Sequence, residues 1–154
     1  MLEAVLGYSK RGWKVFPCAG AVTGDPRSGK RPLTPNGYKD ASSDEKVIRA
    51  WWERWPEANI GLPTGAINKK TVLDVDPRHG GHISLEKYTM PAGPYVKTGG
   101  GGKHIYANYN KYIKNGNNII APGLDIKNDG GYVVLPPSRH YSGASYCWCD
   151  EDLL

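Results

Sequence analysis

Residues 71–76 read Thr-Val-Leu-Asp-Val-Asp, so two acids stand two positions apart within an apolar, β-branched run. Side chains two apart on a strand share a face, and a strand here therefore directs Leu73 and Val75 into a core. Asp74 and Asp76 then stand together on the opposite face. Neighbouring carboxylates oppose each other's ionisation unless a cation lies between them, and Mg²⁺ and Mn²⁺ prefer oxygen ligands. The run predicts a metal site on a strand, with an ordinary strand end carrying two solvated acids as the alternative.

The length and composition indicate one domain that could meet a polyanion. The chain has 154 residues, which is enough for a single domain with a proper core, and we predict one domain over residues 1–154. Its 20 Lys and Arg against 15 Asp and Glu give a formal charge of +5, which is compatible with a nucleic-acid partner. The cysteines at 18, 147 and 149 lack zinc-site spacing and are expected to be reduced thiols. No apolar run approaches the ~20 residues that span a bilayer, so we expect a soluble protein with no membrane partner.

The hydrophobic pattern predicts helices mainly in the first part of the chain and strands after it. Helices are predicted over residues 1–11, from a capping box at Ser42 and Glu45 to a position before Pro56, and for about two turns over residues 83–88. Strands are predicted over residues 13–17, 59–63, 71–75, 95–98, 103–108, 124–127, 132–135 and 146–148. An early helical part followed by an antiparallel-looking set favours an α+β fold over a doubly wound parallel sheet.

Four consecutive glycines join two of the predicted strands. The segment reads Lys97, Thr98, Gly99, Gly100, Gly101, Gly102, Lys103, His104. So many glycines cost backbone entropy, and they leave several amides free to converge on an anion such as a triphosphate. The segment is not a Walker A sequence because the Gly-Lys-Ser/Thr ending is missing. A triphosphate-binding loop is predicted, and a flexible hairpin tip is the alternative.

A third acid follows the same alternation as the first two. Leu124 and Ile126 point one way on a strand, whereas Asp125 and Lys127 point the other. Three carboxylates on adjacent strands beside a basic loop are typical of metal-assisted phosphoryl or nucleotidyl transfer with two cations. His104, at the mouth of the glycine loop, can donate to a phosphate from one ring nitrogen, although a structural histidine is the alternative.

A stiff turn near the C-terminal end offers further polar groups. Residues 136–140 read Pro-Pro-Ser-Arg-His, and the two prolines restrict the backbone that precedes Arg139 and His140. The side chains of Ser138, Arg139 and His140 are candidates for contacting nucleotide or primer, with a plain structural turn as the alternative.

The motifs together resemble a known family. They are residues 11–17, 30–33, 51–52 with 56, 59–61, 73–76, 97–104, 123–127 and 136–138. In order and spacing this set resembles the N-terminal catalytic domain of the bifunctional DNA primase/polymerase (Prim-Pol) family, within the archaeo-eukaryotic primase superfamily. The resemblance covers almost the whole chain and implies an RRM-like antiparallel sheet as catalytic core beside an N-terminal α/β unit.

The resemblance also implies roles for individual residues. Asp74, Asp76 and Asp125 would bind the two catalytic Mg²⁺ or Mn²⁺ ions, and His104 would hold the nucleotide's phosphates. Further nucleotide contacts are expected from Lys30, Lys97, Thr98, Gly99, Gly100, Gly101, Gly102, Lys103 and Lys127, and nucleic-acid contacts from Arg31, Arg139 and His140. The family's second motif often reads Ser-x-His, but Gly102 takes the serine's place here, so backbone amides must replace a hydroxyl contact.

The implied activity is metal-dependent DNA primase/polymerase chemistry, with template-directed transfer of nucleotides from dNTP or NTP to a 3′-hydroxyl. The expected partners are a single-stranded DNA template and primer, and a helicase or a helical primase C-terminal region. The expected setting is the cytoplasm, with a plasmid, phage or other mobile element as the source. Two other functions share part of this pattern: a non-catalytic RRM-like nucleic-acid-binding module, and a metal-dependent phosphohydrolase.

Overall fold

The fold was analysed in a computed structural model that describes residues 1–89 and 93–149. The helices are α1 (Leu2–Lys10), α2 (Glu45–Arg54) and α3 (Gly81–Leu85), and the 3₁₀ turns are η1 (Gly37–Asp40) and η2 (Pro77–His79). The strands are β1 (Phe16–Cys18), β2 (Asn59–Pro63), β3 (Lys70–Val75), β4 (Tyr95–Lys97), β5 (Lys103–Asn108), β6 (Gly116–Ala121), β7 (Leu124–Lys127), β8 (Tyr132–Leu135) and β9 (Cys147–Cys149).

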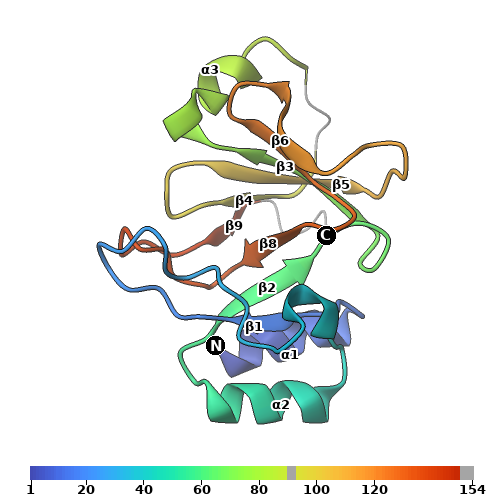
Figure 1. The fold of residues 1–154 in the computed structure, drawn as a ribbon, viewed down its shortest axis with the longest axis vertical. Coiled ribbons are helices and arrows are strands. Elements are labelled where there is room, and N and C mark those ends of the chain that lie inside the picture. Colours follow the sequence, from blue (N-terminus) through green and yellow to red (C-terminus); the bar gives the residue numbers. More distant parts are fainter. Residues whose placement is uncertain (90–92, 150–154) are drawn as a thin grey trace.

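The strands form two antiparallel sheets. The small sheet has the order β1-β2-β8, and the large sheet has the order β6-β7-β3-β5-β4-β9. Figure 1 shows α1 and α2 at one end, the small sheet next to them, the large sheet beyond it, and α3 at the far end. The large sheet therefore turns one face to the small sheet and the other to α3. These antiparallel sheets with few helices confirm the predicted α+β class.

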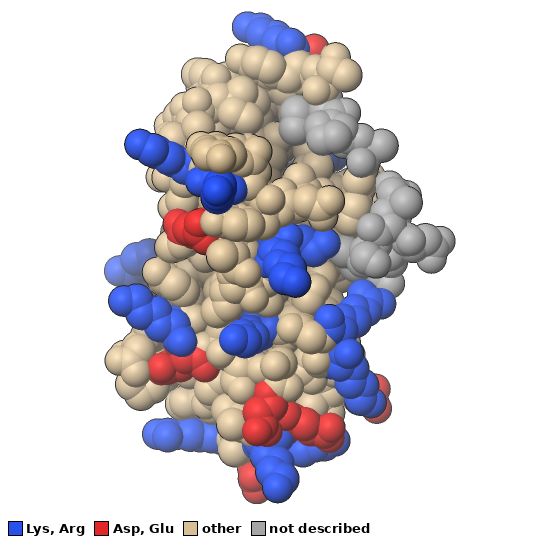
Figure 2. Space-filling model, turned by 90° about the vertical axis from the view of Figure 1, so that its right-hand side faces the viewer, with Lys and Arg blue, Asp and Glu red and all other residues tan. Residues whose placement is uncertain are grey.

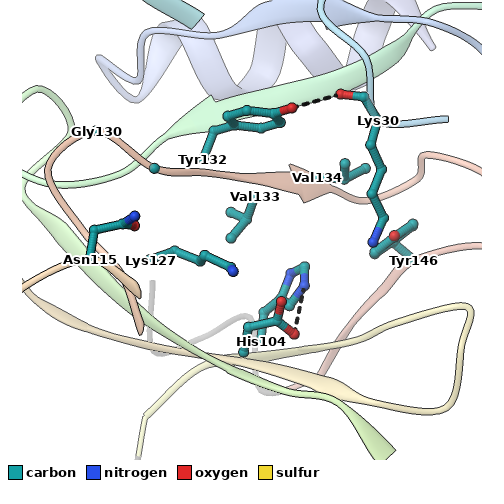
Figure 3. Close-up of a pocket in the computed structure, with 11 residues that line it drawn as sticks. Lys30, His104, Asn115, Lys127, Gly130, Tyr132, Val133, Val134 and Tyr146 are labelled. Atoms are coloured by element: carbon teal, nitrogen blue, oxygen red, sulfur yellow. Dashed lines mark hydrogen bonds and ion pairs between the residues drawn. The ribbon is translucent and has the colours of Figure 1, made fainter. Parts of the chain in front are cut away.

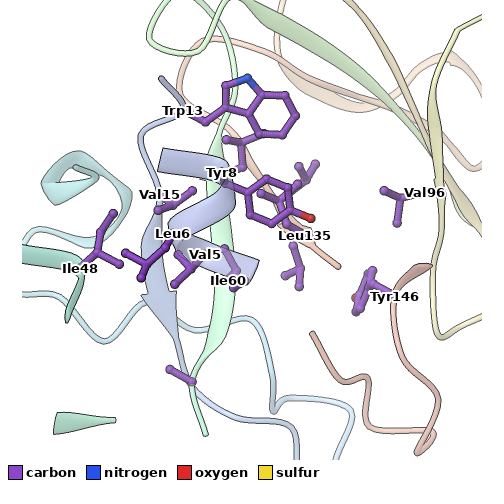
Figure 4. Close-up of a cluster of buried hydrophobic side chains, with 14 of the residues drawn as sticks. Val5, Leu6, Tyr8, Trp13, Val15, Ile48, Ile60, Val96, Leu135 and Tyr146 are labelled. Carbon is purple, nitrogen blue, oxygen red and sulfur yellow. The ribbon is translucent and has the colours of Figure 1, made fainter. Parts of the chain in front are cut away.

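Two hydrophobic clusters occupy the two sides of the large sheet. The larger cluster joins α1, α2 and the small sheet to the near face of the large sheet, which contributes Val72, Val96 and Tyr106. Figure 4 shows part of this cluster, including Val96. The smaller cluster contains Leu73, Val75, Leu124 and Ile126, with Leu85 of α3 packed against it. The prediction that Leu73 and Val75 enter a core is confirmed.

The start of α2 differs from the predicted capping box. The cap is Asp44, whose Oδ1 accepts hydrogen bonds from the amides of Lys46 at 2.7 Å and Val47 at 3.4 Å. Ser42 acts one step earlier, because its Oγ accepts from the Asp44 amide at 3.0 Å. Asp44 is the better cap since its carboxylate faces the unpaired amides at the positive end of the helix dipole.

The strand predictions need two further corrections. The predicted strand over residues 13–17 begins only at Phe16, and Val15 before it makes an isolated bridge to Ser42. β6 was not predicted, because its residues Gly-Asn-Asn-Ile-Ile-Ala do not alternate between polar and apolar. It pairs with β7 through an irregular register that only the tertiary structure reveals.

None of the helices within residues 1–89 and 93–149 is long and apolar enough to span a membrane.

Candidate active site

Three of the predicted site residues lie in one row across the large sheet. Asp74 on β3 is paired with His104 on β5 and with Asp125 on β7. Residues directly opposite each other in an antiparallel pair point to the same face, so all three side chains face the small sheet. His104 Nε2 lies 3.6 Å from Asp74 Oδ1. The register thus assembles an imidazole and two carboxylates from segments far apart in the sequence.

Two adjoining hollows open beside this row. The larger, of about 280 Å³, lies between the row and β8, and is lined by Lys30, Asp74, His104, Asn115, Lys127, Gly130, Gly131, Tyr132, Val133, Val134 and Tyr146 (Figure 3). The smaller, of about 40 Å³, is lined by Lys30, Asp74, Val75, Asp76, Pro77, Arg78, Thr98, Gly100, His104, His140 and Tyr146. Four residues line both hollows: Lys30, Asp74, His104 and Tyr146. Asp74 and His104 therefore stand at the junction of the two spaces.

Asp76 lines the smaller hollow but is held by its own neighbours. It caps η2, where its Oδ1 accepts from the Arg78 amide at 2.9 Å. The Arg78 guanidinium binds both carboxylate oxygens, with Nε 3.1 Å from Oδ1 and Nη2 2.9 Å from Oδ2. His79 Nδ1 lies 3.0 Å from Oδ2. The hydrogen bonds from Arg78 hold the pKa of Asp76 well below its usual range, so this carboxylate is ionised at neutral pH.

Asp125 is likewise paired with a cation of the same strand. Lys127 Nζ lies 3.2 Å from its Oδ2, and the Asn118 amide donates to its Oδ1 at 2.8 Å. Figure 3 shows the Lys127 ammonium group pointing into the larger hollow, toward His104. Lys127 therefore contacts Asp125 and borders the space that a ligand would enter.

The carboxylates suit a divalent metal by chemistry more than by their present placement. Asp74, Asp76 and Asp125 offer the oxygen ligands that Mg²⁺ and Mn²⁺ prefer, and the first two border one hollow. As placed, however, no group of three or more His, Cys, Asp or Glu side chains within residues 1–89 and 93–149 is arranged to hold a metal ion. A cation shared by all three acids would compete with Arg78 for Asp76 and with Lys127 for Asp125.

His104 is buried at the junction of the hollows. Only 6% of the residue is exposed, and its Nδ1 has no hydrogen-bond partner in the described part of the chain. Burial lowers the pKa of His104, and this effect outweighs the opposing influence of Asp74. A neutral imidazole carries one N–H, which can donate from Nε2 toward the hollow if the proton resides there. An unpaired buried nitrogen costs about 1–3 kcal/mol, a loss that is more readily tolerated at a functional site than in a purely structural core.

The glycine loop packs mainly against its own protein. A Cβ added at Gly99 would lie 2.2 Å from Cβ of His140, and one added at Gly102 would lie 2.3 Å from the Val75 carbonyl oxygen. Gly101 has a φ of +82°, which favours glycine. The amides of Gly101 and Gly102 donate to Thr98, to its carbonyl oxygen and to Oγ1 respectively. The loop therefore reaches the smaller hollow through Thr98 and Gly100, with two of its amides already bound.

The two lysines that flank the glycines lie on the other face of the sheet. Lys97 pairs with Lys103, one position away from the Val96–His104 pair, so both lysines point away from the face that carries His104. Lys103 Nζ instead lies 5.1 Å from the centre of the Tyr95 ring. Among the residues described, neither lysine lines either hollow.

The predicted basic contacts outside the glycine loop also divide into residues that line a hollow and residues that do not. Lys30 lines both hollows and His140 lines the smaller one. Burial, with smaller contributions from Lys30 and Arg78, lowers the pKa of His140. Arg31 and Arg139 are exposed and absent from the described lining of both hollows.

Sequence reasoning did not single out Arg78, Asn115, Tyr132 and Tyr146, whose polar or aromatic side chains line the hollows. Arg78 follows Asp76 by two positions, and this proximity was a usable signal. Tyr132 donates from its hydroxyl to the Lys30 carbonyl at 3.2 Å and so ties the loop that carries Lys30 to the small sheet. Tyr146 is 3% exposed, and burial raises its pKa, so its phenol stays protonated. Nothing local in the sequence distinguishes Asn115, Tyr132 or Tyr146 from ordinary strand and loop residues.

The chain was compared with known proteins and with models of protein families. No individual curated protein gives a significant match. A family model described as "bifunctional DNA primase/polymerase, N-terminal" matches residues 5–153, which is nearly the whole chain. The chain therefore belongs to the Prim-Pol family of bifunctional DNA primase/polymerase N-terminal domains.

Proposed function

We propose that this chain catalyses metal-dependent, template-directed transfer of nucleotides from a nucleoside triphosphate to a 3′-hydroxyl. Its family suggests DNA primase/polymerase activity. The observation that carries the proposal is the row of His104, Asp74 and Asp125, in register on three adjacent strands. Asp74 and His104 of this row border both hollows. Lys30 also lines both hollows and Lys127 lines the larger one, and such ammonium groups are what a polyphosphate ligand requires.

The positively charged and donor groups in the hollows are assigned to the nucleotide. Lys30 and Lys127 would pair with phosphate oxygens, and neutral His104 would donate one hydrogen bond to them. Thr98 and Gly100 border the smaller hollow from the glycine loop. Hydrogen bonds and ion pairs in a partly closed hollow orient the triphosphate better than a fully hydrated surface does.

The acids are assigned to divalent cations. Asp74, Asp76 and Asp125 would hold Mg²⁺ or Mn²⁺, since their oxygens are ligands of the preferred type. Such cations, when bound, make a hydroxyl a stronger nucleophile and stabilise charge on a departing pyrophosphate. Asp74 has the central role because it neighbours both His104 and Asp125 and borders both hollows. The macromolecular partners in this proposal are a single-stranded DNA template and a primer.

Primer extension tests the proposal. The wild type and Asp74→Ala are incubated with a primed template, dNTPs or NTPs, and Mg²⁺ or Mn²⁺, with EDTA in a parallel reaction. Extension by the wild type, lost in the variant and in EDTA, supports the proposal. Release of phosphate or pyrophosphate without extension indicates a phosphohydrolase, and template binding alone indicates a binding module. Equal extension by the variant contradicts the role of the acids.

A further inference from the structure

A long part of the chain carries positive charge alone. Between Glu86 and Asp125 there is no acidic residue, and the segment contains Lys87, Lys97, Lys103, Lys111 and Lys114. Figure 2 shows Lys and Arg side chains over the whole height of one face, whereas Asp and Glu lie mostly in its lower half. The loop between β5 and β6 lies on the side of the molecule that this view faces (Figure 1).

That loop exposes a large aromatic ring. Tyr112 is 82% exposed, and the Lys111 ammonium lies 5.1 Å from the centre of its ring. Ile113 next to it is 38% exposed, and Lys114 is also exposed. An exposed aromatic ring between two lysines combines a flat stacking surface with charges that can pair with phosphates.

Hydrogen bonds from the buried Asn128 hold this loop in place. Asn128 is fully buried, and its side-chain amide donates to the carbonyl oxygens of Asn110, at 2.9 Å, and of Ile113. Its backbone amide donates to Asn115 Oδ1 at 3.0 Å. Asn110 Oδ1 in turn accepts from the Tyr112 amide at 2.9 Å. The loop is thus ordered before any ligand arrives, which reduces the entropy lost on binding.

The loop also continues into the candidate active site. Asn115 lines the larger hollow, only three residues from Tyr112. Three residues of extended chain span at most roughly 10 Å. Asn117 Oδ1 lies 3.2 Å from Lys127 Nζ, and Lys127 lines the same hollow. A nucleic-acid strand that leaves the larger hollow along this loop therefore reaches Tyr112 next.

We propose that residues 109–115, the loop between β5 and β6, form a docking surface for single-stranded nucleic acid. We call this segment the tyrosine loop. Tyr112 stacks on a base, and Lys111 and Lys114 pair with the backbone phosphates. The inference rests on the proposed function, since it specifies where the template strand runs next to the active site. A protein partner fits less well, because the exposed ring of Tyr112 lies between Lys111 and Lys114, whose charges match a polyanion. The carboxylate of Asp129 beside the loop accepts a hydrogen bond from the Tyr109 hydroxyl at 2.7 Å.

Equilibrium binding of a fluorescently labelled single-stranded DNA oligonucleotide, without nucleotide or primer, tests the proposal. Tyr112→Ala is expected to weaken binding at least about fivefold, because stacking on one aromatic ring contributes roughly 1–3 kcal/mol per base. Tyr112→Phe keeps the ring and is expected to bind like the wild type. Unchanged affinity in Tyr112→Ala, or equal losses in both variants, overturns the assignment of Tyr112.

The salt dependence of binding tests the lysines. Lys114→Ala is expected to make the slope of log K against log salt concentration shallower by about 0.7, the value for one phosphate contact on a single strand. Lys46→Ala, at an exposed position of α2 at the end of the molecule that α1 and α2 form, is the matched control and is expected to leave the slope unchanged. Equal slopes for Lys114→Ala and the wild type overturn the phosphate contact. If Tyr112→Ala changes the self-association of the protein without any oligonucleotide, the loop contacts a second copy of the chain, and the assignment to nucleic acid is overturned.

The outcome can be separated from that of the proposed function. If wild-type protein binds DNA through Tyr112 but never extends a primer, the docking surface stands and the proposed chemistry is wrong. If extension depends on Asp74 but Tyr112→Ala binds normally, the chemistry stands and the docking surface is wrong.

Discussion

The two faces of β3 carry alternate residues of one strand and serve different purposes. On the α3 side, Leu73 and Val75 pack with Leu124 in a small apolar cluster. On the side of the small sheet, Asp74 stands beside His104 and borders both hollows. The first face is apolar at these positions. The second also packs Val72 into the larger cluster, but next to it accepts polar groups that an apolar core would exclude.

On β3, residues that stabilise the core and residues that face the hollows are only one position apart. A shift of one residue in the pairing of β3 would exchange the two faces, placing Asp74 in the apolar cluster and Leu73 at the hollows. The apolar pair therefore maintains the register on which the polar row depends. Substitutions on each face should consequently have separable effects.

The largest effect is expected from removing the central charge. Asp74→Asn keeps the shape of the side chain but loses its negative charge, and primer extension should fall by on the order of 10²–10³-fold, as for other groups that stabilise charge at a reacting centre. Thermal unfolding of the variant should match the wild type. A matching drop in both activity and thermal stability would mean that Asp74 is structural, and the contrast between the faces would disappear.

The apolar face should respond in the opposite way. Leu124 is fully buried, so Leu124→Ala should lower the free energy of unfolding by roughly 2–5 kcal/mol through lost burial and the cavity left behind. Urea unfolding measures this change. Extension by the fraction that remains folded should stay near the wild-type rate per molecule, and a loss as deep as that of Asp74→Asn would contradict the division of tasks.

A pair of lysines sharpens the comparison at the hollows. Lys30 lines both hollows, and Lys30→Ala should raise KM for the nucleotide about tenfold, the loss of one charge-assisted contact. Lys103 points to the other face, and Lys103→Ala should change KM by less than about twofold, because substitutions away from a site usually cost no more than ~0.5 kcal/mol. Steady-state kinetics with varied dNTP measures both, and a larger effect for Lys103 would reverse the assignment of faces.

The smallest effect concerns a thiol away from both faces of β3. Burial raises the pKa of Cys18 from 9.0 to about 12, so the folded protein binds this proton more tightly than the unfolded chain does. The contribution of Cys18 to stability is therefore complete below pH 9 and is lost as pH rises toward 12. A thiol reagent at pH 8 should modify exposed Cys147 and spare Cys18 until urea is added. Rapid labelling of Cys18 in the native protein would show that this side of the small sheet is open.

Prediction from the sequence succeeded where a local pattern carries the information. The alternation of Leu73, Asp74 and Val75 predicted which side chains enter a core, and the acids of the row were all found in advance. It failed where the pattern is weak or ambiguous. β6 has no alternation, and Asp44 and Ser42 compete for the same helix start.

The glycine loop shows a different limit. Its lysines and glycines predicted an anion cradle, yet the faces of Lys97 and Lys103 follow from the strand register, and Gly99 and Gly102 are required by contacts with His140 and Val75. The capture of Asp76 by Arg78 depends on a turn whose geometry no spacing rule specifies.

The sequence by itself determined the class of the fold, the family and the face of β3 on which Asp74 lies, because side-chain periodicity is a property of the local backbone. The tertiary structure alone decided that His104 and Asp125 stand opposite Asp74, since strand pairing depends on burial against partners distant in the chain. It also decided that Lys30, Tyr132 and Tyr146 meet at one hollow, because they come from separate segments that only the packing of the small sheet on the large one brings together.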